Sequence, residues 1–228
     1  MEFAENYLPA ARIPSYARNP LTDAPEGGAA MMLYDSITLA SASPRRSQLL
    51  EQIGVRHLVR ATDVDEALRP GEPAEAYVAR LAAAKAEVAW AADRPRPVLA
   101  ADTAVVLGAE LFGKPEDLND GVRMLSALAG RTHRVLTAVA LRSTAGLSQA
   151  LSVSEVTFRA LSDTECRRYW ASGEPRGKAG GYAIQGLAAT FITRLAGSYS
   201  GVMGLPLAET AALLGAAGVR LWNTEEAA

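Results

Sequence analysis

The sequence predicts an α/β fold, a single domain of strands and helices with a cleft. Patterns typical of strands and of helices alternate from Ile37 onward, as they do when helices pack on a sheet. The length of 228 residues suits one domain with a substantial core. The 23 basic and 25 acidic residues nearly balance, so the net charge gives no reason to expect nucleic acid or an anionic membrane as a partner.

The cysteine content indicates a reducing compartment. Cys166 is the one cysteine of the sequence, which excludes an intrachain disulfide and a zinc site built from a cysteine cluster. Its neighbours have a helical pattern, so we expect Cys166 to be a small buried apolar residue. No apolar run approaches the roughly 20 residues that span a bilayer. We therefore expect a cytoplasmic protein with no membrane partner.

Residues 1–34 differ from the rest of the chain. They contain four of the 12 prolines and a PEGG segment, and they show no hydrophobic periodicity. This composition predicts a loosely ordered N-terminal extension, followed by a domain over residues 35–228. Several acidic residues and the lack of an apolar stretch after a basic start give no support for a secretory or transit peptide.

The first predicted strand and helix place two arginines at the N-terminus of the helix. A short strand is predicted over residues 37–41, and a serine followed by Pro44 predicts the start of a helix that ends at Gly54. Arg45 and Arg46 then lie in the first helical turn, where the helix dipole disfavours cations. Two alternatives remain: the arginines are solvated, or an anion lies between them.

The second helix, predicted over residues 73–92, directs a lysine toward the core. Its apolar face is expected to consist of Tyr77, Leu81, Ala84 and Val88. At 100° per residue, Lys85 falls within about 40° of that face. A lysine that points inward requires a partner of opposite charge or hydrogen-bonding groups.

The remaining elements continue the alternation. Strands are expected at 97–102, ending in Asp102, and then in a hairpin over 103–112, at 133–142, at 151–159 and at 190–195. Helices are expected at 118–129, after a capping box formed by Ser162 and Glu165, and at 205–217. The glycine-rich residues 172–181 are expected to form a loop.

Two motifs that suggest other kinds of chemistry are disfavoured. Gly108 to Lys114 fits the phosphate-binding pattern G-x-x-x-x-G-K, but Pro115 follows where a hydroxyl should bind magnesium, and the flanking pattern is a hairpin. No G-x-S-x-G elbow is present, so a serine hydrolase is a poor candidate. His57 and His133 lie in strand-like segments without metal-ligand spacing, and we expect structural or surface roles for them.

A scattered set of charged residues suits a triphosphate. The cations are Arg45, Arg46, Lys85, Lys114 and Lys178, and the carboxylates are Glu66 and Asp102. Each alone is compatible with an ordinary surface or structural role. Phosphoryl chemistry needs cations for the charged oxygens and carboxylates for a hard divalent metal, so we expect Mg²⁺ or Mn²⁺ on Asp102 and Glu66. Asp102 is expected at the end of a buried strand, where ligands gather in α/β folds.

Five blocks of sequence occur in a fixed order between about residues 37 and 215. They read LASASPRRSQLL, AADTAVV with GKP after it, HRVLTAVAL, KAGGYAIQG and GSYSGVMGLPL. Together they resemble the Maf family of nucleoside triphosphate pyrophosphatases. The SPRR and YAIQG segments resemble the branch that acts on dTTP and UTP, not the branch that acts on methylated GTP.

This resemblance implies a fold and a set of site residues. The fold would be a two-lobed mixed sheet with flanking helices, similar to that of inosine triphosphatases, with the cleft between the lobes. The expected catalytic residues are Asp102, Lys85, Lys114 and Glu66, and the expected substrate-binding residues are Ser41, Arg45, Arg46, Thr103 and Gln185. Members of the family are often dimeric, so a homodimer is expected, and the partner molecule is a nucleoside triphosphate.

The expected reaction is hydrolysis of dTTP or UTP to the nucleoside monophosphate and pyrophosphate. Water, activated by Asp102 and a divalent metal, would cleave between the α- and β-phosphates. Two alternatives from other classes are an ATPase that releases orthophosphate and a regulator of cell division that binds nucleotide without turnover. The second follows from the link between the family name and septum formation.

Overall fold

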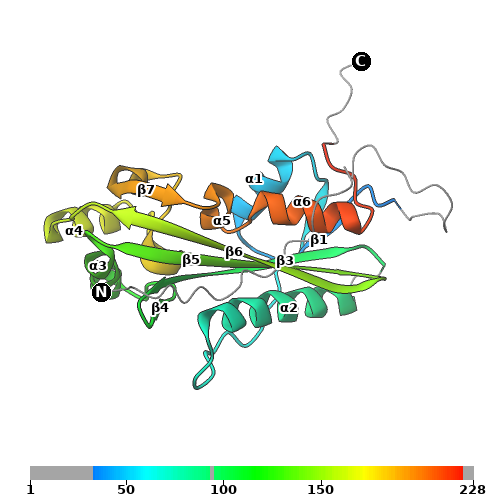
Figure 1. Cartoon of the computed structure of the whole chain (residues 1–228), viewed down its shortest axis with the longest axis horizontal. Helices are drawn as coiled ribbons and strands as arrows, with labels where there is room; N and C mark the ends of the chain where they lie inside the picture. The colour runs from blue at the N-terminus through cyan, green and yellow to red at the C-terminus, as the bar shows by residue number, and fades with distance from the viewer. Residues whose placement is uncertain (1–32, 93–94, 223–228) are drawn as a thin grey trace, which may run out of the picture. The chain divides into compact units, whose positions relative to one another are not determined.

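A computed structural model describes residues 33–92 and 95–222 of the chain and confirms a mixed α/β fold (Figure 1). The strands are β1 (Ile37–Leu39), β2 (His57–Val59), β3 (Val98–Leu107), β4 (Glu110–Phe112), β5 (Thr132–Ser143), β6 (Gly146–Phe158) and β7 (Ile192–Ala196). The α-helices are α1 (Pro44–Gln52), α2 (Ala74–Ala92), α3 (Leu118–Leu128), α4 (Asp163–Ala171), α5 (Tyr199–Met203) and α6 (Leu207–Ala216). Two 3₁₀ helices are η1 (Ala179–Gly181) and η2 (Leu187–Phe191).

Within the described residues, the strands form one seven-stranded sheet. Its order is β2-β1-β3-β5-β6-β7, and β4 pairs separately with β3. The β1 strand is parallel to β2 and β3, whereas the other pairs are antiparallel. The sheet is therefore mixed, with its parallel part at the N-terminal end of the domain sequence.

The central strand β3 has an unpaired stretch on one edge. Its other edge pairs with β5 from Val98 to Val106 without interruption. On the first edge, β1 pairs with β3 as far as Leu99, and β4 begins to pair at Val105. Among the described strands, none pairs with this edge between those two points. We call this interval, residues 100–104, the β3 gap.

The predicted end of the strand at Asp102 is wrong. Asp102 lies in the middle of β3, because the antiparallel pairing with β5 carries the strand on to Leu107 and into the hairpin with β4. The strand that ends here is the neighbour, β1. Asp102 is therefore next to the carboxyl end of a parallel strand, although it does not end a strand itself.

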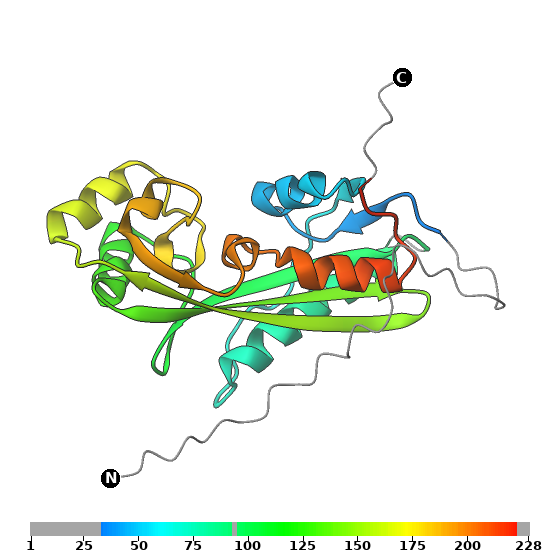
Figure 2. The same ribbon diagram turned by 45° about the horizontal axis from the view of Figure 1, so that its top comes forward.

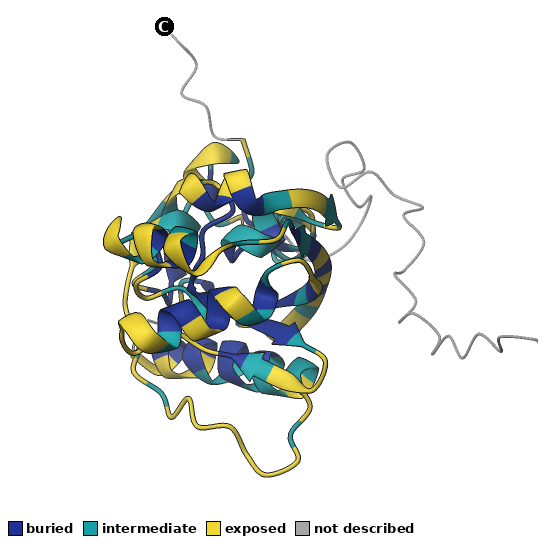
Figure 3. Ribbon diagram, turned by 90° about the vertical axis from the view of Figure 1, so that its left-hand side faces the viewer, coloured by how far each residue is buried: buried dark blue, intermediate teal, exposed yellow. Residues whose placement is uncertain are grey.

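Helices cover both faces of the sheet (Figures 1 and 2). The long helix α2 lies on one face, and α1, α5 and α6 lie on the other. The buried residues of the sheet and of the helix faces that turn toward it make up the interior (Figure 3). Apolar residues pack under α2 on one face of the sheet and around α1 and α6 on the other. A further apolar cluster lies around α3, α4 and β7, at the end of the sheet away from β1. The two lobes expected from the sequence are thus two ends of one sheet.

The buried face of α2 differs from the expected one. Val88 is 48% exposed, whereas Val78, Ala82 and Trp90 are buried against the sheet. The sequence AEAYVARLAAAKAEVAWAA contains so many alanines that periodicity fixes the direction of the helix face poorly. Lys85 is nevertheless buried, as predicted.

Several local expectations are confirmed. Ser162 caps α4 in a capping box with Glu165. Cys166 is fully buried in the cluster near α3 and α4. Residues 108–112 form the turn and the second strand of the β3–β4 hairpin, so the segment that fits the phosphate-loop pattern has a different backbone from that of a strand-loop-helix unit.

His133 has a structural environment. It is buried beside the edges of Phe158 and Tyr182, and its Nε2 atom lies 2.8 Å from the Tyr182 hydroxyl. Burial lowers the pKa of His133 to about 4. The folded protein therefore holds this imidazole in its neutral form at neutral pH.

Most of the predicted N-terminal extension lies outside the described residues. Of residues 1–34, the structure describes Leu33 and Tyr34. The amide of Tyr34 donates to the carbonyl of Gly218, and the amide of Arg220 donates to the carbonyl of Tyr34. The boundary at residue 34 stays a prediction. In the part of the chain that is described, no helix is long and apolar enough to cross a membrane.

The environment of His133 predicts how stability depends on pH. Its pKa is lower in the folded state, at about 4, than in the unfolded chain. The unfolded state therefore binds more protons between about pH 6.5 and pH 4, so stability is lost as the pH falls through that window, by up to roughly 1.4 kcal/mol per pH unit. A His133→Phe variant should have a flatter dependence of Tm on pH over this range. Equal slopes for the two proteins would contradict this account.

Candidate active site

A cavity of about 940 Å³ opens over the β3 gap. Every residue that the sequence predicted for the site lines it: Ser41, Arg45, Arg46, Glu66, Lys85, Asp102, Thr103, Lys114 and Gln185. These residues come from the β1–α1 turn, the first turn of α1, the β2–α2 loop, α2, β3, the residues after β4, and the segment before η2. The fold therefore brings together residues that span some 145 positions of sequence, from Ser41 to Gln185.

The alternating direction of the side chains along β3 places Asp102 and Thr103 on opposite faces of the sheet. Successive side chains of a strand point to opposite faces. Asp102 shares its face with Ala100 and Ala104, which pack in the cluster under α2. Thr103 points to the opposite face, where α1 and α5 lie. Because the edge is unpaired here, both side chains reach the cavity.

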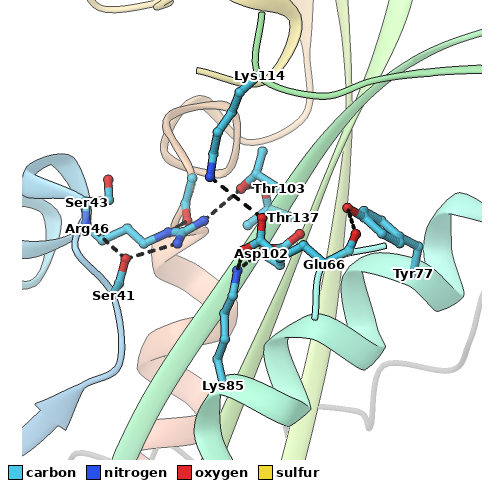
Figure 4. Close-up of polar contacts among 11 residues, drawn as sticks. Ser41, Ser43, Arg46, Glu66, Tyr77, Lys85, Asp102, Thr103, Lys114 and Thr137 are labelled. Atoms are coloured by element: carbon cyan, nitrogen blue, oxygen red, sulfur yellow. Dashed lines mark hydrogen bonds and ion pairs between the residues drawn. The ribbon is translucent and has the colours of Figure 1, made fainter. Parts of the chain in front are cut away.

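On the α2 face, one lysine binds two carboxylates (Figure 4). The Nζ atom of Lys85 lies 2.6 Å from Asp102 Oδ1 and 2.6 Å from Glu66 Oε1. Lys85 and Asp102 are buried, with side chains 11% and 12% exposed, whereas the Glu66 side chain is 43% exposed. The inward lysine predicted from the helical periodicity thus has carboxylate partners. We call Lys85, Asp102 and Glu66 the charged triad.

The loop that carries Glu66 is held by α2. The Tyr77 hydroxyl donates to the Glu66 carbonyl at 3.0 Å, and Arg80 donates to the carbonyl of Ala67 at 3.0 Å. Arg80 also forms a 2.6 Å ion pair with Glu72. Burial would raise the pKa of Glu66, but the hydrogen bond and charge of Lys85, with the charge of Lys114, outweigh it and hold the pKa below its ordinary value.

Lys114 approaches the triad from the β4 side. Phe112 pairs with Val105, so the residues after β4 run back alongside the β3 gap. The Lys114 Nζ atom lies 3.7 Å from Glu66 Oε2, and the lysine side chain is 63% exposed. Lys114 is thus a solvent-facing cation at the rim, in contrast to the buried Lys85.

On the opposite face, Arg46 is fixed by three hydrogen bonds. Its guanidinium donates to the Gly204 carbonyl at 2.8 Å, the Ser41 hydroxyl at 3.1 Å and the Thr103 hydroxyl at 3.3 Å. The Thr103 hydroxyl lies 2.9 Å from that of Thr137 on β5. These bonds join α1, β3, β5 and the end of α5 around the SPRR turn.

The environment of Arg45 is suited to an anion. Arg45 is partly buried, and its buried Nε atom has no hydrogen-bond partner. Burial lowers the pKa of Arg45, although the charges of Tyr169 and Glu174 oppose the shift. Burial also lowers the pKa of Arg46, where the charge of Asp102 opposes the shift and the positive charge of Arg45 adds to it. An anion would relieve both the burial and the repulsion of the two guanidinium groups, which favours the second alternative for this turn.

The start of α1 agrees with this interpretation. Ser43 and Pro44 occupy the predicted N-cap and first helical positions, but the Ser43 side chain makes no capping hydrogen bond. No acidic residue lies in the first turn of α1. The positive end of the helix dipole is thus left without a negative group, next to two arginines.

Two contributions to the site were missed from the sequence. Thr137 donates to the carbonyl of Gly201 at 2.8 Å and supports Thr103. A threonine at a buried position in the apolar strand HRVLTAVAL was a signal for a polar partner. Gly204, whose carbonyl binds Arg46, ends α5 with a φ of 112°, a backbone conformation that favours glycine.

Gln185 and Lys178 line the cavity from the segment that leads into η2. Gln185 is exposed, and Lys178 is partly buried and donates to the backbone carbonyl of Glu174. Burial and the neighbouring Arg45 lower the pKa of Lys178. Lys178 thus adds a second cation beside Arg45 on this side of the cavity.

The structure offers two hard oxygen donors to a metal. Within residues 33–92 and 95–222, no group of three or more His, Cys, Asp and Glu side chains gathers as a metal site. Glu66 and Asp102 do converge, because both bind the same Lys85 nitrogen. Mg²⁺ is commonly bound by one or two carboxylates together with substrate phosphates, so the donor chemistry fits such an ion.

The chain belongs to the Maf family. The family model described as Maf-like protein matches residues 36–217. A dTTP/UTP pyrophosphatase from Cupriavidus pinatubonensis is 53% identical over 199 residues, which cover 82% of this chain and 100% of that protein. A dTTP/UTP pyrophosphatase from Chromobacterium violaceum is 52% identical over 191 residues, which cover 81% of this chain and 96% of that protein.

Among solved structures, the chain is similar to the Staphylococcus aureus Ham1 protein, with a TM-score of 0.42 at 13% identity, covering 79% of this chain and 96% of that one.

The charged triad predicts the behaviour of a Lys85→Met variant. Methionine keeps the stem of the side chain but removes the cation between Asp102 and Glu66. We expect a folded protein of lower Tm, because Asp102 loses its buried partner, and a kcat/KM for dTTP lower by roughly 10²-fold or more. Circular dichroism and pyrophosphate release measure the two effects.

The control for this variant is Arg134→Met, which removes an ion pair with Glu75 away from the cavity. It should keep a kcat/KM near that of the wild type. Wild-type kinetics in Lys85→Met would show that this lysine has only a structural role.

Proposed function

We propose that this protein is a nucleoside triphosphate pyrophosphatase that hydrolyses dTTP and UTP to the nucleoside monophosphate and pyrophosphate. The observation that carries the proposal is the cavity over the β3 gap, in which a buried carboxylate–lysine pair faces a cluster of cations. The close similarity to dTTP/UTP pyrophosphatases supports the choice of nucleotide.

Asp102 is the proposed general base. Lys85 binds Asp102 Oδ1 and fixes the carboxylate in the cavity, so that the Oδ2 atom can accept a proton from water. The water oxygen attacks the α-phosphorus, the bond from the α-phosphorus to the bridging oxygen breaks, and pyrophosphate leaves. The proton taken by Asp102 then passes to solvent. The products are one nucleoside monophosphate, one pyrophosphate and one proton.

The cations are proposed to hold the triphosphate. Arg45 and Arg46 lie at the N-terminus of α1, where backbone N–H groups and the helix dipole also favour an anion. The Ser41 and Thr103 hydroxyls fix the orientation of Arg46. Lys114, at the rim, can close on the phosphates as they enter. Arg46 is fixed by its three hydrogen bonds before the substrate binds, so it can stabilise negative charge in the transition state without a large reorganisation.

A divalent cation, Mg²⁺ or Mn²⁺, is part of the proposal. Glu66 and Asp102 would hold it together with substrate oxygens. When bound, such an ion neutralises charge on the phosphates and polarises a phosphoryl oxygen. In the absence of the ion, the ammonium group of Lys85 keeps the two carboxylates close together.

Gln185 is proposed to read the base. Its amide carries both a donor and an acceptor, which is what the edge of a thymine or uracil ring requires. It is exposed at the cavity wall, in the segment before η2. The alternative is that Gln185 only supports the turn beside Gly186.

A panel of nucleotides tests the proposal directly. The wild-type protein, supplied with Mg²⁺ or Mn²⁺, should release pyrophosphate from dTTP and UTP with a kcat/KM well above those for ATP and GTP. Release of orthophosphate would support the ATPase alternative. Nucleotide binding without any turnover would support the regulator, and a preference for GTP would overturn the choice of nucleotide.

An Asp102→Asn variant should lose turnover but keep nucleotide binding. Asparagine keeps the shape of the side chain, but it cannot accept the proton or bind a metal strongly. Loss of a general base alone costs roughly 10²- to 10⁴-fold in kcat. The measurement is kcat at saturating metal with a parallel binding titration. Retention of more than about a tenth of wild-type turnover would show that Asp102 is not the base.

A Gln185→Ala variant should lose kcat/KM for pyrimidine nucleotides more than for purine nucleotides. A ligand that leaves polar groups unpaired costs about 1–3 kcal/mol per group, and only the matched base uses the amide. The kcat/KM values for all four nucleotides are compared in the two proteins. Equal losses across the panel would indicate that Gln185 supports the loop and reads no base.

A further inference from the structure

A second carboxylate centre lies on the cavity wall away from the charged triad. Glu174 lines the cavity, and its carboxylate accepts three hydrogen bonds. The Tyr169 hydroxyl donates to Oε1 at 2.7 Å, the amide of Leu187 donates to Oε2 at 2.9 Å, and the amide of Ala188 donates to Oε1 at 3.3 Å. The carboxylate thus joins α4 to the first residues of η2.

These contacts hold both ends of the segment that carries Gln185. The Tyr169 hydroxyl, which donates to Glu174, also accepts a hydrogen bond from the amide of Ala183 at 3.1 Å. Ala183 precedes Gln185 by two residues, and Leu187 follows it by two. We call residues 182–188 the base segment. Its start is tied to Tyr169 and its end is tied to Glu174.

Gly186 shows how closely Glu174 approaches this segment. A Cβ atom at position 186 would lie 2.2 Å from Glu174 Oε2 and 2.4 Å from its Cδ atom. The φ of Gly186 is −110°, which does not itself require glycine. The absence of a side chain at position 186 is therefore explained by the Glu174 carboxylate, not by the backbone.

The charge of Glu174 suits this position. Burial would raise its pKa, but hydrogen bonds from Leu187, Tyr169 and Ala188 outweigh burial and hold the pKa below its ordinary value. The carboxylate also lies close enough to Arg45 to act on the charge of that guanidinium. An ionised group is thus placed between the base segment and the SPRR turn.

We propose that Glu174 is a positioning residue for nucleotide selection, because its carboxylate fixes the base segment so that the Gln185 side chain faces the cavity. The idea rests on the proposed role of Gln185 in the proposed function. Glu174 does not contact the reacting phosphates in this proposal. Its removal should therefore change the choice of base more than the chemistry.

A Glu174→Ala variant tests the proposal by kinetics. The ratio of kcat/KM for dTTP to kcat/KM for ATP should fall by about fivefold or more, as expected for loss of one or more polar contacts to the base. Most of the change should appear in KM for dTTP, and kcat should fall little. An unchanged ratio, or equal losses for the two nucleotides, would overturn the proposal.

The matched control is Glu165→Ala. Glu165 also binds backbone and side-chain groups, namely the amide and hydroxyl of Ser162 and the guanidinium of Arg159, but it lies in the capping box at the far end of α4 and does not line the cavity. Its removal should lower Tm without a change in the dTTP-to-ATP ratio. An equal shift of the ratio in this control would show that any loss of stability alters selection, and would also overturn the proposal.

A cycle with Gly186→Ala separates the local contact from general damage. Gly186→Ala should displace the carboxylate and lower the ratio by itself. In the double variant with Glu174→Ala, the new methyl group meets no carboxylate, so the loss should be no larger than in Glu174→Ala alone. Additive losses would contradict the proposed contact.

Two further measurements keep the test decisive. If Glu174→Ala fails to fold, Tyr169→Phe removes, at nearly constant volume, the hydroxyl that donates to Glu174 and accepts from the Ala183 amide, and it should also lower the ratio. Amide hydrogen exchange of residues 182–188 in Glu174→Ala should be faster than in the wild type, whether or not dTTP is a substrate. Slow, unchanged exchange would overturn the proposal even if the wild type is inactive on dTTP, whereas inactivity alone would overturn only the proposed function.

Discussion

The ion pairs of Lys85 are the interaction on which the site depends. One ammonium group lies 2.6 Å from a buried aspartate and 2.6 Å from a glutamate of a neighbouring loop. Without it, the buried Asp102 carboxylate would lose its cation beside a second carboxylate, and an unpaired buried charge costs several kcal/mol. With it, the carboxylate that we propose as the general base is held in a cavity that cations also line. The lysine therefore keeps the acidic side of the site in place when no substrate is bound.

The position of Asp102, the buried partner of this lysine, follows from the sheet. The β1 strand leaves β3 after Leu99 and β4 joins it at Val105, so the central strand has an open edge between them. Because successive side chains of a strand point to opposite faces of the sheet, Asp102 lies on the α2 side and Thr103 on the α1 side. The carboxylates of Asp102 and Glu66 lie on one face and Arg46 on the other, and all three line the cavity over the gap. The proposed catalytic arrangement is thus a consequence of where two neighbouring strands stop.

Much of this arrangement could be predicted from the sequence, and the misses have physical causes. The order of strands and helices, the inward direction of Lys85 and the helix start at Pro44 all follow from local patterns. The end of a strand at Asp102 was wrong, because pairing with β5 is a long-range contact that local composition does not encode. Val88 was predicted to be buried but is exposed, because the many alanines of α2 make its apolar face hard to identify from the sequence. The hydrogen bond from the Leu187 amide to the Glu174 carboxylate joins residues 13 positions apart, and no local sequence pattern predicts it.

The central claim is that Lys85 and Asp102 act as one unit, and a double-variant cycle on kcat/KM tests it most directly. Lys85→Met, Asp102→Asn and the double variant are compared with the wild type by pyrophosphate release from dTTP at saturating metal. If the two residues form one unit, the double variant should be no more impaired than the worse single variant, because either change already disables the pair. Losses that multiply in the double variant would show that the two residues contribute independently, and would contradict the account.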